Sequence, residues 1–233
     1  MYGMLGLAAL ALLAAPSARA ATISRPVVVE LFTSEGCSSC PPADAVLRDL
    51  ARDRPDVLAL GFHVTYWDHL GWHDPFALPE ATQRQREYGA RMRGPVYTPQ
   101  MVIDGTHDVV GSDRADVFRT IQQAASASGA GVAVRLRRDG EGVLVDLSAG
   151  VGAGSVVLIG YDGEHRTSVA HGENGGRSLV EANIVRSVVP LGGWSGAASR
   201  LRHARPAGER IAVIVQSETG AVLGAAREDG DAS

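Results

Sequence analysis

The sequence predicts a mixed α/β domain with a helical insertion, followed by a β-rich domain. Strand-like and helix-like segments alternate through the first half of the 233 residues. In the second half, apolar residues recur at every second position, which is typical of strands with one buried face. Cys37 and Cys40, the only cysteines, lie between the first predicted strand and the first predicted helix. The expected chemistry therefore centres on this junction.

The first three segments predict a strand, a helix and a second strand. Residues 27–32 form an apolar run that is interrupted only by Glu30. After the cysteines, apolar residues recur at spacings of three and four, which predicts an amphipathic helix packed on a sheet. These apolar positions are Ala43, Val46, Leu47, Leu50 and Ala51. Because residues 57–64 are mostly apolar, they predict a buried parallel strand.

An insertion, residues 65–96, follows, and its segment 79–92 has the pattern of a helix. Residues 101–103 predict a short strand, and the Asp104-Gly105 dipeptide predicts a hairpin turn after it. Asp113 is a plausible N-cap for a helix that reaches about Ser126. The order β-α-β, helical insertion, β-β-α is that of a thioredoxin-like domain, which we assign to residues 21–128.

Residues 129–233 predict a β-sandwich-like domain. Small residues and glycines at 126–131 mark a boundary before it. Helix signals are few beyond this point, which favours packed sheets. The candidate strands are residues 132–136, 143–147, 156–161, 179–189, 210–216 and 221–226.

Residues 1–20 predict an export signal. Residues 5–15 are apolar, and Ala18-Arg19-Ala20 fits the small-x-small cleavage pattern. The apolar stretch is too short to span a bilayer comfortably, so we expect no stable membrane insertion after cleavage. The mature protein is expected to be periplasmic or secreted, in an oxidising compartment. A net charge of -4 gives no indication of a nucleic-acid partner.

The spacing of Cys37 and Cys40 favours a redox-active pair over a structural disulfide. Strand, CxxC and helix in succession are typical of the active-site corner of thioredoxin-like proteins. Closing so short a loop stabilises a fold by only about 2 kcal/mol, against about 4.7 kcal/mol for a loop of roughly 100 residues. Cys37 is expected to attack as a thiolate and Cys40 to resolve the mixed disulfide. The two prolines after Cys40 are expected to delay the helix to Pro42 or Ala43.

Thr98, Pro99 and Glu30 complete the predicted catalytic set. Thioredoxin-like proteins place a cis-proline beside the CxxC at the start of a strand, and the backbone before it pairs with an incoming peptide. A cis bond to proline costs only about 0.5–1 kcal/mol, although a trans proline at the first strand residue is the alternative. Glu30 lies near the place of a buried acid that accepts a proton from the resolving cysteine. A strand-edge charge or a local salt bridge explains Glu30 equally well.

A metal site is an alternative at the same place. Imidazole and thiolate ligands suit copper or zinc, so Cys37, Cys40 and His63 form the alternative ligand set. His63 ends the strand beside the CxxC and can also tune the thiol pKa. Histidines and aspartates in the insertion more often cap and pack a loop than bind metal: Asp68, His69, His73 and Asp74. No cofactor is predicted.

A polar, glycine-rich segment, residues 171–177, lies between two predicted strands of the second domain. Its side chains could bind a ligand. A turn between the two strands is the favoured interpretation, because glycine and asparagine are typical turn residues.

Several motifs occur together along the mature chain: VVELFTSEGCSSCPPAD at 28–44, HVTYWD at 63–68, GW at 71–72, DPF at 74–76, RQ at 84–85, YTPQ at 97–100, GEN at 172–174 and GR at 176–177. With these motifs the chain resembles a secreted bacterial family with a thioredoxin-like fold, catalogued as a domain of unknown function. The resemblance implies that fold and export, and it supplies no substrate. Thr65 stands where an acidic residue is expected, which weakens a metal site there.

These inferences combine into a periplasmic or secreted thiol–disulfide oxidoreductase or redox-responsive protein. Its expected partner is a protein thiol or disulfide, which Thr98 and Pro99 position for the cysteines. Two alternatives remain open: a protein that binds or delivers copper or another metal, and a binding module with an inert structural disulfide.

Overall fold

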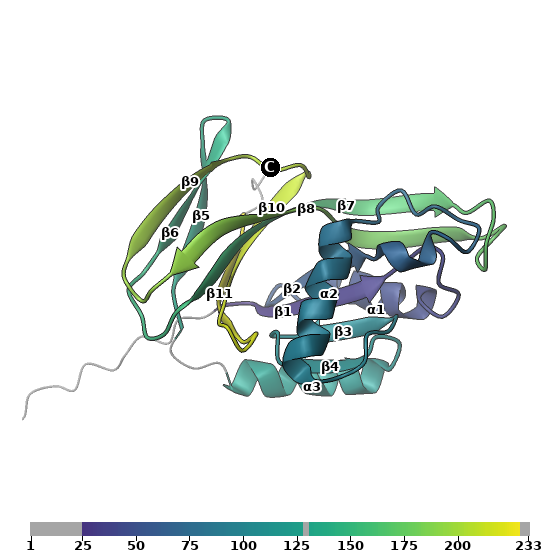
Figure 1. Cartoon of the computed structure of the whole chain (residues 1–233), viewed down its shortest axis with the longest axis horizontal. Helices are drawn as coiled ribbons and strands as arrows, with labels where there is room; N and C mark the ends of the chain where they lie inside the picture. The colour runs from purple at the N-terminus through teal and green to yellow at the C-terminus, as the bar shows by residue number, and fades with distance from the viewer. Residues whose placement is uncertain (1–24, 128–130, 229–233) are drawn as a thin grey trace, which may run out of the picture.

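An eight-stranded mixed sheet extends through both halves of the chain (Figure 1). The structure, a computed structural model, describes residues 25–127 and 131–228, so the predicted export signal at 1–20 lies outside the described residues. The strands in spatial order are β11 (Val222–Arg227), β10 (Arg210–Gln216), β7 (Gly154–Ser168), β8 (Ser178–Trp194), β2 (Val57–His63), β1 (Val27–Thr33), β3 (Gln100–Ile103) and β4 (His107–Val110).

The N-terminal strands follow the predicted order. β1 and β2 are parallel and paired along their whole length, whereas β3 is antiparallel to β1 and β4 is antiparallel to β3. Asp104 and Gly105 have φ values of 49° and 73°, which are the left-handed conformations that a tight hairpin turn requires. The hairpin predicted from the Asp-Gly dipeptide is therefore confirmed.

Three α-helices cover the two faces of this part of the sheet. Along β1, Val29 and Leu31 pack in a cluster with α1 (Pro41–Asp53) and α3 (Arg114–Ala127), and Phe32 packs on the other face with α2 (Pro79–Met92). Because successive strand residues point to opposite faces and both faces are covered, β1 is apolar almost throughout. A short 3₁₀ helix, η1 (Thr65–Trp67), begins the insertion. None of the described helices is long and apolar enough to cross a membrane.

A second, three-stranded sheet lies over the C-terminal part of the large one (Figure 1). It consists of β5 (Val134–Asp139), β6 (Gly142–Leu147) and β9 (Ser199–Ala204). Val143 and Val145 of β6 share one core cluster with Leu158 of β7 and Val213 of β10, so the two sheets face each other. The sequence did not predict β9, because its residues are mostly exposed and four of the six are polar or charged.

The large sheet continues across the boundary that the sequence predicts between residues 128 and 129. β8 lies beside β2, with Ile184 opposite Gly61 in a parallel register. One core cluster also unites Phe62 from the first half with Ile159 and Val185 from the second. The two halves therefore share a sheet and a core, and β8 reaches the end of β2 near which the cysteines lie.

Candidate functional site

The candidate site lies where β1 ends and α1 begins. Cys37 and Cys40 form a disulfide, and neither residue exposes any surface (0%). α1 begins at Pro41, directly after Cys40, whose φ and ψ of -78° and -37° are already helical. The expected delay of the helix to Pro42 or Ala43 is therefore wrong. Proline is tolerated in the first turn because the N–H that it lacks has no partner there.

Two hydroxyl groups contact the sulfur of Cys37. Thr98 Oγ1 donates to Cys37 Sγ at 3.4 Å, and Ser39 Oγ lies 3.3 Å from the same atom. Trp67 Nε1 fixes Thr98 by donating to its hydroxyl at 2.9 Å. The Thr98–Pro99 peptide bond is cis, as predicted. Hydrogen bonds to a sulfur favour its charged form, so this arrangement can stabilise a thiolate at Cys37.

Glu30 does not occupy its predicted role. Its side chain points to the face covered by α2, where Arg84 binds the carboxylate through three contacts of 2.7–3.1 Å. Arg84 also donates to the Tyr88 hydroxyl at 2.9 Å. Cys40, in contrast, directly precedes α1, which packs on the opposite face of the sheet. The alternative interpretation, a local salt bridge, describes Glu30 better than proton transfer with Cys40 does.

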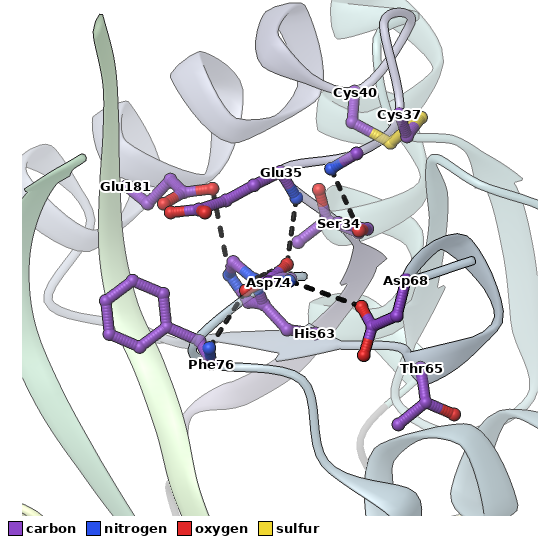
Figure 2. A network of polar contacts seen from close by, with 12 residues as sticks. Ser34, Glu35, Cys37, Cys40, His63, Thr65, Asp68, Asp74, Phe76 and Glu181 are labelled. Atoms are coloured by element: carbon purple, nitrogen blue, oxygen red, sulfur yellow. Dashed lines mark hydrogen bonds and ion pairs between the residues drawn. A yellow bond between two sulfur atoms is a disulfide. The ribbon is translucent and has the colours of Figure 1, made fainter. Parts of the chain in front are cut away.

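A buried cluster of acidic side chains surrounds His63 close to the disulfide (Figure 2). His63 Nδ1 lies 2.8 Å from Asp74 Oδ2, and Nε2 lies 3.8 Å from Glu181 Oε1. Asp74 Oδ2 also accepts the Glu35 amide at 2.9 Å. Among the described residues, neither carboxylate oxygen of Glu181 has a hydrogen-bond partner. The cluster thus joins β2, the insertion, the turn before Cys37 and β8 of the second half.

Burial and charge shift the pKa values of this cluster. Burial raises the pKa of Glu181 to about 8 and that of Asp44 to about 6, and it also raises the pKa of Glu35. Burial opposes the charged form of His63, yet the attraction of Asp74 and Glu181 raises the pKa of His63 to about 10. Burial also works against ionised Asp74, but His63 lowers the pKa of Asp74. The cluster therefore holds an imidazolium–carboxylate pair beside carboxyl groups that titrate near neutral pH.

The predicted alternative metal ligands are engaged elsewhere. Cys37 and Cys40 bond to each other, and His63 contacts the acidic cluster. In the insertion, His73 forms an ion pair with Asp68 at 3.2 Å. Across residues 25–127 and 131–228, no three His, Cys, Asp or Glu side chains are placed to hold a metal ion.

The glycine-rich loop between β7 and β8 packs on the CxxC turn. Asn174, which is fully buried, donates from Nδ2 to the carbonyl oxygens of Glu35 at 2.8 Å and Cys37 at 3.0 Å. Glu173 Oε2 accepts the Ser38 amide at 3.1 Å. The predicted turn between two strands is confirmed, but its contact with the cysteines was missed. Only the unusual density of polar side chains in a glycine-rich turn hinted at such a role.

Relatives of the chain are found among families and solved structures. The family described as "Protein of unknown function (DUF1223)" matches residues 28–216. A crystal structure of a protein from Agrobacterium tumefaciens is similar, with 31% identity and a TM-score of 0.76, over 89% of this chain and 95% of that one. HBP35 of Porphyromonas gingivalis shares the fold alone, with 16% identity and a TM-score of 0.60, over 91% of this chain and 77% of that one. No curated protein matches. The chain belongs to the DUF1223 family of proteins of unknown function.

Proposed function

We propose that the protein is an exported thiol–disulfide oxidoreductase or redox-responsive protein whose N-terminal half is thioredoxin-like. One observation carries the proposal: a CxxC disulfide at the N-terminus of α1, with the Thr98 hydroxyl 3.4 Å from Cys37 Sγ. The order β1-α1-β2-β3-β4-α3 supports the thioredoxin-like assignment, as does the place of Pro99 directly before β3. A cysteine at a helix N-terminus with hydroxyl donors is the setting in which thiols ionise readily.

In the proposed reaction, a thiolate of a partner protein attacks Cys37 Sγ. The new bond joins the partner to Cys37, the Cys37–Cys40 bond breaks, and Cys40 leaves with the electron pair and takes up a proton. A second partner thiol loses its proton and attacks the partner sulfur of the mixed disulfide, so that Cys37 leaves and is protonated. The partner loses two electrons and two protons, and the two cysteines gain them. The reverse sequence, in which Cys37 attacks a partner disulfide, balances in the same way.

The buried cluster is the proposed source of the proton for Cys40. Asp44 follows Cys40 by one helical turn, and its amide donates to the Cys40 carbonyl at 3.1 Å. Burial raises the pKa of Asp44 to about 6 and that of Glu181 to about 8. Carboxyl groups that titrate near the working pH are effective proton donors and acceptors. Asp44 therefore replaces Glu30 as the proton donor in the proposed mechanism.

The proposed compartment is the periplasm or the extracellular space. The disulfide supports this location, because disulfides persist in oxidising compartments and are rare in the cytosol. The predicted export signal at residues 1–20 supports it independently.

Trapping of mixed disulfides tests the proposal. Cys40→Ser should accumulate mixed disulfides with partner proteins, because Cys37 can attack and nothing resolves the product. Cys37→Ser should trap none and should not turn over a dithiol or disulfide substrate. Ser199→Ala, at an exposed position on β9, is the control and should keep activity. Unchanged turnover in Cys37→Ser would sink the proposed function.

The complete burial of both cysteines favours one other candidate function, a binding module with an inert disulfide. The reduction potential of the pair decides between them. Structural disulfides have potentials below about -300 mV, whereas values between about -270 and -120 mV belong to reductants and oxidants of the thioredoxin type.

A further inference from the structure

The loop between β7 and β8 brings the C-terminal half into direct contact with the proposed redox site. We infer that Glu173 and Asn174 of this loop are positioning residues of that site, which hold the CxxC turn and disfavour the thiolate form of Cys37. The inference rests on the proposed function, because it concerns the reactivity of the same cysteine.

Asn174 fixes the main chain on which Cys37 lies. Its Nδ2 donates to the carbonyl oxygens of Glu35 and Cys37, and its Oδ1 accepts from Arg177 at 2.6 Å. The side chain exposes no surface (0%), so these bonds are shielded from competing water. A turn that served only to join two strands would not need a buried amide that binds a segment 137–139 residues away.

Glu173, the neighbour of Asn174, acts on the amide that follows Cys37. Its Oε2 accepts from Ser38 N at 3.1 Å, and hydrogen bonds from the side chain and then the amide of Ser38 lower the pKa of Glu173, which keeps the side chain ionised at neutral pH. The amides at the start of α1 form the positive end of the helix, which stabilises a thiolate. The Glu173 carboxylate binds the Ser38 amide in the turn just before α1, so it repels a thiolate at this end and occupies an N–H between the two cysteines. Glu173 therefore opposes the effect of the Thr98 hydroxyl.

Other ionisable groups surround the same turn from the neighbouring elements. They are Glu35 before the cysteines, Asp44 on α1, His63 on β2, Asp74 in the insertion, Glu181 on β8 and Arg177 on the loop itself. These groups are unchanged when Glu173 is replaced by an uncharged residue. A difference in the pKa of Cys37 between the chain with Glu173 and the variant therefore reports the charge and the hydrogen bond of Glu173.

The test is a pH titration of the Cys37 thiol in the full chain. In a Cys40→Ser background, Cys37 is the only thiol, and its thiolate is followed by ultraviolet absorbance. Glu173→Gln and Glu173→Ala should lower the pKa of Cys37 by roughly half a unit to one unit, which is a threefold to tenfold rise in its acid dissociation constant. The difference should shrink at high salt, because Glu173 is exposed. His171→Ala, exposed on the same loop, is the control and should leave the titration unchanged.

Asn174→Ala should change the pKa of Cys37 in the same direction as Glu173→Ala, because Asn174 holds the loop that carries Glu173. The double variant should add little to either single one, as expected for residues that act as a unit. Glu173→Gln alters only an exposed side chain, so it tests the inference even where Asn174→Ala fails to fold.

An unchanged or raised pKa of Cys37 in both Glu173 variants would overturn the inference. The titration needs neither a partner protein nor turnover, so its outcome can be distinguished from a failure of the proposed function. A lowered pKa without any disulfide exchange in the unmodified chain supports this inference and overturns the proposed function. If the unmodified chain exchanges disulfides but the pKa of Cys37 is unshifted in the Glu173 variants, this inference is overturned and the proposed function stands.

Discussion

The Arg84 guanidinium binds both carboxylate oxygens of Glu30 in the core between α2 and β1. Both side chains are almost fully buried, with 8% and 1% of their surfaces exposed. Arg84→Met should therefore lower the free energy of unfolding by roughly 3–5 kcal/mol, because it leaves an unpaired carboxylate in the core. Urea unfolding measures the change.

Two comparisons make this prediction specific. Arg86→Ala, at an exposed position on the same helix, should change stability by less than about 0.5 kcal/mol. The double variant Glu30→Gln, Arg84→Met should recover much of the loss, since it removes the unpaired charge. Glu30→Gln should leave the reduction potential of the cysteine pair unchanged, and a shifted potential would return Glu30 to a role in the reaction.

The buried cluster predicts that stability falls as the pH rises. The pKa of His63 is raised from 6.5 to about 10 in the folded state, so the stability that His63 contributes is complete below pH 6.5 and is lost as the pH rises through 10. The pKa of Glu181 is raised from 4.5 to about 8, so the stability that Glu181 contributes is lost as the pH rises from 4.5 to 8. The two windows overlap between pH 6.5 and 8, where the decline should be steepest.

Urea midpoints at constant ionic strength measure this decline. Glu181→Gln should flatten the profile between pH 4.5 and 8, because a neutral amide cannot titrate. A profile that is the same in the variant and the unmodified chain would show that Glu181 does not titrate in this range.

The hydroxyl of Thr98 is predicted to favour the thiolate of Cys37. Thr98→Val keeps the side-chain shape but removes the donor at 3.4 Å from Cys37 Sγ, so the pKa of Cys37 should rise by roughly half a unit. Thr98→Ser keeps a hydroxyl and is the control. Thiolate absorbance in the Cys40→Ser background follows the Cys37 thiol in each variant, and equal pKa values for the two variants would contradict a role for the hydroxyl.

Residues 21–128 are not expected to fold alone. The face of the sheet that carries Phe32 and Phe62 packs against Ile159, Val185 and other apolar residues of the second half. Removing that half exposes this core and the edge of β2, so the fragment should lack a cooperative urea transition while the full chain shows one. A cooperative transition in the fragment would show instead that the first half is an independent domain.

Local patterns were enough to predict the N-terminal elements and the place of the cysteines between the first strand and the first helix. The helix after Cys40 follows from apolar residues spaced three and four apart, and β1 and β2 follow from continuous apolar runs. These elements depend on the preferences of neighbouring residues, which the sequence displays directly. The cis bond at Thr98–Pro99 was predicted on another basis, because thioredoxin-like proteins place a cis-proline beside the CxxC at the start of a strand.

Partners that lie far apart in the chain could not be predicted. Glu30 finds Arg84 across 54 residues, and Glu173 reaches Ser38 across 135. Such pairs form only because the chain places α2 under β1 and β8 beside β2. No periodicity or turn signal predicts which side chain will contact which distant group. The sequence therefore identified the CxxC corner, whereas the tertiary structure decided which acids surround it. Those acids, through burial and charge, are what can adjust the reactivity of Cys37.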